Sequence, residues 1–371
     1  MPITTFELSN FRLYEQASLH PDRRLTILVG ANASGKTSLL EAIHLLSTGR
    51  TFRKANLEQV VRQGADGFAI SAEYESMDGK LPSRLAVMQA GETRQISING
   101  SGGARQSELA QALPVLVVSP DSHFEFQQNA RERRAVLDWI LFHVEHRFHD
   151  TWSRYQRTLA QRNSALKDSK HGRATFSWDD ELAQLGEALQ SSRENCLSAV
   201  AERFKSICAQ LLPSVAGLEL RLNAGWDKTV GLAGSLFNDR TRDLARGFTH
   251  SGPHRSDLRI LVDDHLSREK ASHGQNKLLV TAVRVAQIQY FFELTGRECC
   301  LLVDDLAAEL DLGNRTQLVS YLAEMPVQVI ITATEAEKLS CQPWPSHKTF
   351  HVKQGVILEV DSPEICHNSP R

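Results

Sequence analysis

A glycine-rich run near the start of the chain carries the residue types that hold phosphate. Residues 30–37 read Gly-Ala-Asn-Ala-Ser-Gly-Lys-Thr, with the spacing G-x4-G-K-T, between an apolar run at 25–29 and a helical pattern at 38–43. In such a loop, backbone N–H groups and the helix N-terminus point at phosphate oxygens. The lysine adds a mobile cation, and the threonine adds a hydroxyl for Mg²⁺. The sequence therefore predicts a nucleoside triphosphate site formed by Gly30, Ala31, Asn32, Ala33, Ser34, Gly35, Lys36, Thr37 and Ser38.

A second segment supplies two carboxylates after an apolar strand. Residues 299–303 read Cys-Cys-Leu-Leu-Val, and Asp304 and Asp305 follow. A buried strand followed by an ordinary Asp-Asp turn has the same pattern, but the phosphate loop upstream favours a nucleotide site. We expect Asp304 to hold Mg²⁺ together with Thr37, and Asp305 to position or deprotonate the attacking water. With Lys36, these two acids are the predicted catalytic residues.

A third segment, Ser272-His273-Gly274-Gln275, opens a strongly apolar helix. Ser272 fits the N-cap of that helix in any case. The same entry also directs a hydroxyl, free N–H groups and the positive end of a helix dipole toward one point, which suits a γ-phosphate. From the residues alone, both interpretations of Ser272, Gly274 and Gln275 stay open.

The order of these three segments resembles that of ATP-binding-cassette ATPases. In that family the Ser-x-Gly-Gln helix faces the nucleotide of a second subunit, so the resemblance implies that two copies sandwich ATP. Residues 307–311, Ala-Ala-Glu-Leu-Asp, resemble the D-loop that crosses the dimer seam. Thr332 stands at the end of an apolar run, where such ATPases place a polar residue near the γ-phosphate.

Further motifs, in order along the chain, resemble the bacterial RecF family of ATPases, which is similar to the structural-maintenance-of-chromosomes (SMC) proteins without their long coiled coil. They are Asn-Phe-Arg at 10–12, Thr-Gly-Arg-Thr-Phe-Arg at 48–53, Arg-Arg-Ala-Val-Leu-Asp-Trp at 133–139, Leu-Ala-Gln-Arg-Asn at 159–163 and Gly-Pro-His-Arg-Ser-Asp-Leu at 252–258. The chain departs from the family at Ala33, where glycine is usual, and at Ala308, where serine is usual.

The resemblance to this family implies a function that composition does not show. It implies ATP and Mg²⁺ as cofactors, an ATP-dependent homodimer and weak, DNA-stimulated ATP hydrolysis that acts as a switch. It also implies binding to single-stranded DNA or single-strand/duplex junctions, and help to RecO and RecR in loading RecA during gap repair, replication restart and SOS induction. Arg12 is expected to lie close to the nucleotide.

Two basic clusters are candidates for contact with DNA. One follows the phosphate-loop helix, and the other lies in a helical region where Lys and Arg outnumber acids although the whole chain has a net charge of −2. Charged helix faces of this kind are as often exposed to solvent without binding DNA, so that alternative stays open. The candidate residues are Arg50, Arg53, Lys54, Arg133, Arg134, Arg154 and Arg157.

The elements that must position these residues predict an α/β protein. Together with the resemblance above, this implies a P-loop ATPase head of the ABC/SMC kind, with mixed sheets and an inserted helical arm. Alternating segments at 68–98 predict antiparallel hairpins, and long helical periods start near residue 132. The predicted domains are the N-terminal part of the head (1–120), the helical arm (121–213), the C-terminal part of the head (214–360) and a polar tail (361–371).

Composition and cysteine usage restrict the class of protein. The 371 residues are 41% hydrophobic and 23% charged, which is typical of a globular chain. The six cysteines show no C-x-x-C spacing, and no stretch approaches ~18 apolar residues, so we expect a cytoplasmic protein without a membrane partner. The alternatives are an ABC-type ATPase subunit of another system and an ATP-binding DNA scaffold without significant hydrolysis.

Overall fold

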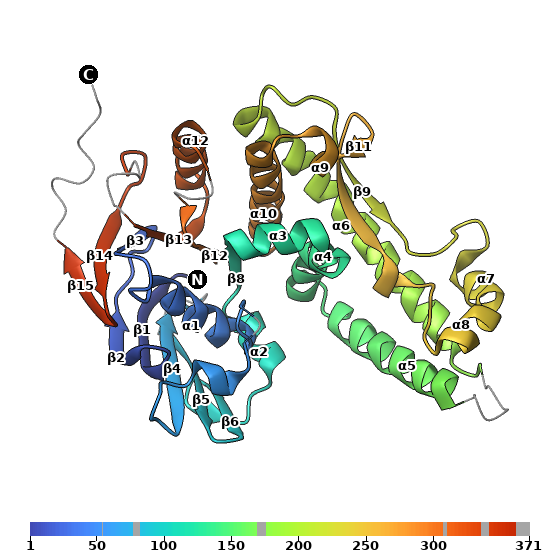
Figure 1. Cartoon of the computed structure of the whole chain (residues 1–371), viewed down its shortest axis with the longest axis horizontal. Helices are drawn as coiled ribbons and strands as arrows, with labels where there is room; N and C mark the ends of the chain where they lie inside the picture. The colour runs from blue at the N-terminus through green and yellow to red at the C-terminus, as the bar shows by residue number, and fades with distance from the viewer. Residues whose placement is uncertain (54, 77–81, 169–175, 307–309, 335–340, 361–371) are drawn as a thin grey trace. The chain divides into compact units, whose positions relative to one another are not determined.

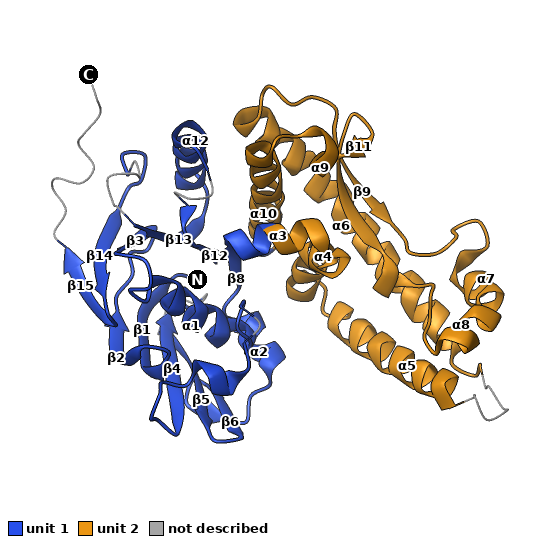
Figure 2. Cartoon of the chain, viewed as in Figure 1, with its two compact units in different colours: residues 1–123, 295–371 blue, residues 124–294 orange. Residues whose placement is uncertain are grey.

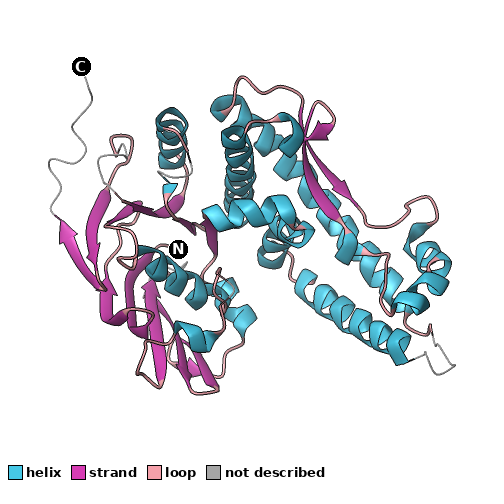
Figure 3. Ribbon diagram, viewed as in Figure 1, coloured by secondary structure: helices cyan, strands magenta, loops and turns pink. Residues whose placement is uncertain are grey.

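Both ends of the chain fold together into one unit, and the middle of the chain forms another (Figure 2). The computed structural model describes residues 1–53, 55–76, 82–168, 176–306, 310–334 and 341–360. The first unit contains residues 1–123 and the chain from 295 onward, and the second contains residues 124–294. Sheets dominate the first unit and helices dominate the second (Figure 3).

A mixed six-stranded sheet forms the framework of the first unit (Figure 1). All its neighbouring strands are parallel except β15 against β14. The three central strands are buried along their whole length, as expected for parallel strands covered on both faces. Their carboxyl ends therefore meet at one edge of the sheet. The strand order is β15 (Val356–Val360), β14 (His347–Lys353), β3 (Leu25–Val29), β13 (Val327–Ala333), β12 (Cys299–Val303) and β8 (Val115–Val118).

A second, antiparallel sheet completes the first unit. The hairpins expected at 68–98 are present, and positive φ angles at Asn99 (51°) and Gly100 (81°) fit the two-residue turn before the last strand. Strand β2 was not expected, because its segment has the polar composition of a loop. The order is β2 (Tyr14–Leu19), β1 (Ile3–Phe11), β4 (Gly67–Tyr74), β5 (Ser83–Ala90), β6 (Thr93–Ile98) and β7 (Ser101–Gly102).

Helix α1 (Lys36–Thr48) contacts strands of both sheets. Its residues Leu39, Leu40 and Ile43 are fully buried in a hydrophobic core that both sheets share. The helix ends at Gly49, whose φ of 66° gives the left-handed conformation common at C-caps. The remaining helices among the described residues of this unit are η1 (Leu57–Val60), α2 (Gln106–Ala112) and α12 (Leu312–Ala323).

The second unit consists of long helices and a small antiparallel sheet (Figure 1). Helix α3 (Pro120–Gln128) leads into it. The sheet has the order β11 (His265–Leu266), β10 (Asp257–Val262) and β9 (Leu218–Asn223). The other helices that the structure describes here are α4 (Ala130–Val144), α5 (Phe148–Asp168), α6 (Asp179–Leu211), α7 (Gly231–Asn238), α8 (Arg240–Arg246), η3 (Pro253–Arg255), α9 (Ser267–Lys270) and α10 (His273–Thr295).

The compact units divide the chain differently from the predicted domains. Helices α4, α5 and α6 lie in the region predicted as the helical arm, but the unit that contains them continues beyond residue 213 to residue 294. The reason is packing, since β9 and α7 contact α6, and β10 contacts α4. A change from helical to strand-like sequence near 213 therefore marks a change of secondary structure inside one unit.

Candidate nucleotide-binding site

The phosphate-type loop connects β3 to α1 at the carboxyl edge of the mixed sheet. Gly30 has no room for a side chain, because an added Cβ would lie 2.2 Å from the carbonyl oxygen of Val352. Gly35 has a φ of 116°, which L side chains rarely adopt. Ala33 is also left-handed, with a φ of 62°, which costs about 1 kcal/mol for a residue with a Cβ. That cost is a physical reason for glycine to be common at this position.

Lys36 folds back over its own loop. Its Nζ donates hydrogen bonds to the carbonyl oxygens of Gly30 (2.6 Å) and Ala31 (2.9 Å). Burial lowers the pKa of Lys36, while the nearby carboxylates of Asp305 and Asp304 oppose that shift. A phosphate would replace the two neutral carbonyl partners with a charged acceptor, which forms a stronger hydrogen bond.

Thr37, Asp304 and Thr332 meet in one hydrogen-bonded cluster although they are far apart in sequence. The Thr37 hydroxyl lies 3.0 Å from both carboxylate oxygens of Asp304, and the Thr332 hydroxyl donates to Asp304 Oδ1 at 2.7 Å. Thr332 also accepts the backbone N–H of Asp305 at 2.8 Å. Burial raises the pKa of Asp304, although the two threonine hydrogen bonds oppose the shift. This cluster ties the ends of β12 and β13 to the first turn of α1.

These residues surround a cavity of about 420 Å³ in the first unit. The expected Lys36, Thr37, Asp304, Asp305 and Thr332 all line it. Gly30 and Ala31 shape the loop through the carbonyl oxygens that bind Lys36. The full lining is Leu13, Asn32, Ala33, Ser34, Gly35, Lys36, Thr37, Ser38, Arg53, Asp304, Asp305, Thr332 and Thr334.

Arg53 is placed differently from its prediction as a DNA contact. It lines this cavity, and its positive charge opposes the rise in the pKa of Asp304 that burial causes. The motif at 48–53 contains Arg53 but does not indicate a place in the nucleotide site, because the approach of Arg53 to Asp304 depends on how the chain folds after α1. Leu13 and Thr334 were likewise missing from the predicted set, although Leu13 directly follows the motif at 10–12 and Thr334 lies two residues after Thr332.

The donor atoms fit a magnesium–triphosphate group. The hydroxyl of Thr37 and the carboxylate of Asp304 are oxygen ligands of the kind Mg²⁺ prefers, and this ion keeps water and phosphate oxygens in its other positions. Within the described residues no cluster of three His, Cys, Asp or Glu side chains could hold a metal by itself. In addition, the buried Ser34 hydroxyl has no hydrogen-bond partner among the described atoms, so a polar ligand would satisfy it.

Arg12 lies beside the cavity in a separate hollow. Its guanidinium makes two hydrogen bonds of 2.9 Å to the fully buried carboxylate of Glu41 and a third to the carbonyl oxygen of Gln59 at 3.0 Å. This hollow shares Leu13 and Ser38 with the main cavity. Arg12 is therefore fixed next to the loop by Glu41, and its contact with nucleotide stays a prediction.

Tyr14, which sequence reasoning did not select, packs against the phosphate-type loop. Its side chain is fully buried, and its hydroxyl donates to the carbonyl oxygen of Gly35 at 3.0 Å. An added Cβ on Gly35 would lie 2.7 Å from the same hydroxyl. Tyr14 thus both holds and restricts the last turn of the loop, and burial raises its pKa well above the ordinary value.

We expect Tyr14→Phe to lower ATP affinity about 3- to 10-fold, because the loss of one neutral hydrogen bond costs ~0.5–1.5 kcal/mol. Titration with a fluorescent ATP analogue measures the change. Tyr74→Phe is the matched control, since Tyr74 is also buried in the first unit but lies away from the cavity. An equal loss of affinity in both variants would show a general effect on stability instead of a role for Tyr14 in the loop.

The Ser272–Gln275 segment belongs to the second unit, where it starts α10. The Ser272 hydroxyl accepts the N–H of Gln275 at 3.2 Å, and the Gln275 side chain accepts the N–H of Ser272 at 2.8 Å. This reciprocal capping box is the role that the simpler interpretation gave to Ser272. Ser272 is exposed, and a Cβ added to Gly274 would meet no neighbour, so the helix entry is open to a ligand.

Arg133 and Arg134 do not have the free guanidinium groups expected of phosphate contacts. Arg133 donates to Asp257 at 2.7 Å and to the carbonyl oxygens of Phe126 and Gln127. Arg134 donates to the carbonyl oxygen of Ser256, and burial lowers its pKa. Both side chains are used within the second unit, and their contact with DNA stays a prediction.

The other predicted DNA contacts have fewer internal partners. Arg154 forms an exposed ion pair with Glu181 at 2.7 Å, while Arg50 and Arg157 are exposed. Lys54 and the D-loop residues 307–309 lie outside the described residues.

Among the helices that the structure describes, none is long and apolar enough to span a membrane.

Comparison with known proteins identifies the family. Residues 2–357 match the family described as "RecF/RecN/SMC N terminal domain". A protein of Chromohalobacter salexigens, named "DNA replication and repair protein RecF", is 36% identical over 364 residues, which cover 96% of this chain and 99% of the relative. The protein of that name from Thioalkalivibrio sulfidiphilus is 35% identical over 361 residues, with coverage of 97% and 100%.

Solved structures show the same fold. A structure of the recombination mediator protein RecF with ATP aligns with a TM-score of 0.82 at 24% identity and covers 97% of this chain and 98% of that chain. A structure of an SMC head bound to the C-terminal winged-helix domain of ScpA aligns with a TM-score of 0.59 at 17% identity, covering 97% of each. The chain therefore belongs to the RecF family of SMC/ABC-type ATPases.

Proposed function

We propose that this protein binds ATP and DNA in recombinational gap repair and replication restart, and that it acts as an ATP-dependent homodimer. The observation that carries the proposal is the meeting of Lys36, Thr37, Asp304 and Thr332 around one cavity on a RecF-family fold. Relatives named for DNA replication and repair, similar over nearly their whole length, support the same role.

Within the cavity, each residue has a distinct proposed task. Lys36 and the N–H groups of the loop would bind the β- and γ-phosphates, while Thr37 and Asp304 would hold Mg²⁺, which would neutralise phosphate charge. Asp305 accepts a proton from the attacking water or orients it. Thr332 fixes the geometry, because it is bonded both to the Asp304 carboxylate and to the Asp305 backbone.

The proposed dimer places the Ser272–Gln275 segment of one copy against the ATP of the other. The support is the chemistry of that helix entry, since Ser272 is exposed at the N-terminus of the 23-residue helix α10. Such a terminus attracts phosphate through its free N–H groups and dipole. Binding of ATP then joins two copies around DNA, and slow hydrolysis releases them. The proposed partners beyond DNA are RecO, RecR and RecA.

Phosphate release measured with and without gapped duplex DNA tests this proposal. We expect slow hydrolysis that increases several-fold when gapped DNA is present, because DNA favours the closed dimer. ATP binding without hydrolysis in either condition would instead support a DNA scaffold. Hydrolysis that DNA leaves unchanged, with no binding to gapped DNA, would support an ATPase subunit of another system.

A further inference from the structure

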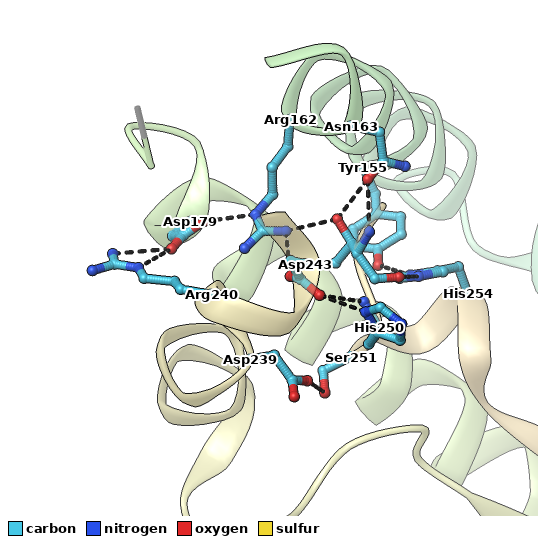
Figure 4. Close-up of polar contacts among 11 residues, drawn as sticks. Tyr155, Arg162, Asn163, Asp179, Asp239, Arg240, Asp243, His250, Ser251 and His254 are labelled. Carbon is cyan, nitrogen blue, oxygen red and sulfur yellow. Dashed lines mark hydrogen bonds and ion pairs between the residues drawn. The ribbon is translucent and has the colours of Figure 1, made fainter. Parts of the chain in front are cut away.

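A buried network of charged and polar side chains lies at one end of the second unit. The side chain of Arg162 is fully buried and donates to Asp179 (2.7 Å), Asp243 (2.7 Å) and the Thr249 hydroxyl (2.8 Å) (Figure 4). Asp179 also accepts two hydrogen bonds from Arg240. Because these residues come from α5, α6, α8 and the following loop, Arg162 joins four segments at one point.

The loop after α8 is bound to the same network at successive positions. Asp243 accepts the N–H of His250 at 3.1 Å and lies 2.7 Å from its ring Nδ1, and Asp239 accepts the Ser251 hydroxyl at 2.6 Å. The Tyr155 hydroxyl lies 2.6 Å from Nδ1 of His254 (Figure 4). Such buried networks hold their members in one arrangement when most polar atoms are satisfied. The network therefore fixes α7, α8 and the loop against α5 and α6.

This fixed frame holds two exposed aromatic rings. Phe237, at the end of α7, is 63% exposed, and Phe248, after α8, is 40% exposed. The Arg240 guanidinium lies between the rings of Phe237 (4.8 Å) and Phe176 (4.3 Å), and the Phe248 ring is 4.3 Å from that of His250. Both exposed rings are thus ordered by a stacking partner, so little conformational entropy would be lost when a ligand covers them.

Exposed cations lie on α8, between the two rings in sequence, and at the end of α5. Arg242 and Arg246 are exposed and are four residues apart on α8, which places them on one face of the helix. Lys167 lies close to Gly247, since a Cβ added to Gly247 would lie 3.2 Å from the Cγ atom of Lys167. The acids of α8 and its N-cap are used internally, since Asp243 binds Arg162 and Asp239 binds Ser251. Asp168, next to Lys167, and Asp180, next to Asp179, are exposed acids in this part of the chain.

We propose that this surface, the arm tip formed by Lys167, Phe237, Arg242, Arg246 and Phe248, binds single-stranded DNA. Ordered aromatic rings stack on unpaired bases, and neighbouring cations contact the phosphates. A duplex offers phosphates as well, but its bases are already stacked on one another and are not available to the rings. The inference rests on the proposed function. It specifies single-stranded DNA as the ligand, and it names a surface that contains none of the residues predicted from sequence to contact DNA.

Fluorescence anisotropy with a labelled 20-nucleotide oligo(dT) and a labelled duplex of equal length tests whether the arm tip binds single-stranded DNA. The loss of each stacked ring is expected to weaken oligo(dT) binding about tenfold, so Phe237→Ala/Phe248→Ala weakens it about 100-fold and duplex binding less than twofold. Phe237→Tyr/Phe248→Tyr keeps the rings and retains the affinity. Phe124→Ala, which removes a ring that is 64% exposed elsewhere, is the matched control and leaves oligo(dT) binding unchanged.

The salt dependence of oligo(dT) binding provides a second readout for the cations. The log–log slope falls by about 0.7 for each single-strand phosphate that the protein no longer neutralises, so Arg242→Gln/Arg246→Gln reduces it by about 1.4. Equal oligo(dT) affinity in the wild type and the double alanine variant would overturn the proposal that the arm tip binds single-stranded DNA. A loss of duplex affinity equal to the loss of oligo(dT) affinity would also overturn it. A wild-type protein that binds no DNA of any form would instead contradict the proposed function.

Discussion

Lys36→Ala is expected to weaken ATP binding at least about 100-fold. Lys36 is the cation of the loop, and its Nζ already lies 2.6 Å from the Gly30 carbonyl inside the cavity. Charge-assisted hydrogen bonds are worth ~1.5–3 kcal/mol each, so the loss of one or two of them to phosphate corresponds to that change in affinity. Calorimetric titration with ATP and Mg²⁺ measures it, and phosphate release should fall below detection.

The control for this variant is Lys348→Ala. Lys348 also lies in the first unit, on β14, but it donates to the carbonyl oxygen of His20 outside the cavity. We expect this variant to bind ATP as the wild type does. If Lys36→Ala also kept the wild-type ATP affinity, the cavity would not be the nucleotide site, and the roles assigned to Thr37 and Asp304 would be wrong as well.

Asp305→Asn is expected to have the second largest effect, on hydrolysis and not on binding. The change keeps the shape of the side chain and the backbone N–H that donates to Thr332, but it removes the carboxylate that accepts a proton. General-base catalysis contributes about 10²–10⁴-fold to rate, so single-turnover phosphate release should slow at least about 100-fold. The ATP affinity should stay within about threefold of the wild type.

A remote acid provides the control for Asp305. Asp66→Asn changes a carboxylate in the loop before β4, outside the cavity lining, and should leave the rate of hydrolysis unchanged. Normal single-turnover hydrolysis by Asp305→Asn would show that another group activates the water. A parallel loss of ATP affinity would instead mean that Asp305 mainly holds the nucleotide or its metal ion.

The strands and the loop of the nucleotide site could be predicted because local sequence determines them. The runs at 25–29 and 299–303 are continuous apolar segments of strand length, and they form the buried strands β3 and β12. Each ends in polar residues of a known motif. Thr37 and Asp304 were both expected to hold Mg²⁺, and their side-chain oxygens lie 3.0 Å apart.

Tertiary contacts could not be predicted in the same way. Arg53 and Tyr14 belong to the site only because the folded chain brings them to Asp304 and Gly35. The motif that contains Arg53 does not indicate this role, and no local pattern marks Tyr14. Arg133 shows the converse situation, since its charge is evident in the sequence but its partner Asp257 is more than a hundred positions away. Charge patterns alone therefore do not separate surface cations from those used inside the fold.

The most direct test of ATP-driven dimerisation is the solution mass of the Asp305→Asn protein with Mg²⁺, measured by light scattering without nucleotide and with excess ATP. We expect a monomer without nucleotide and a dimer with ATP, because slow hydrolysis preserves the sandwiched state. Ser272→Arg, at the exposed entry of α10, should prevent the shift while leaving ATP binding intact. A mass that stays monomeric while ATP is demonstrably bound would contradict the account.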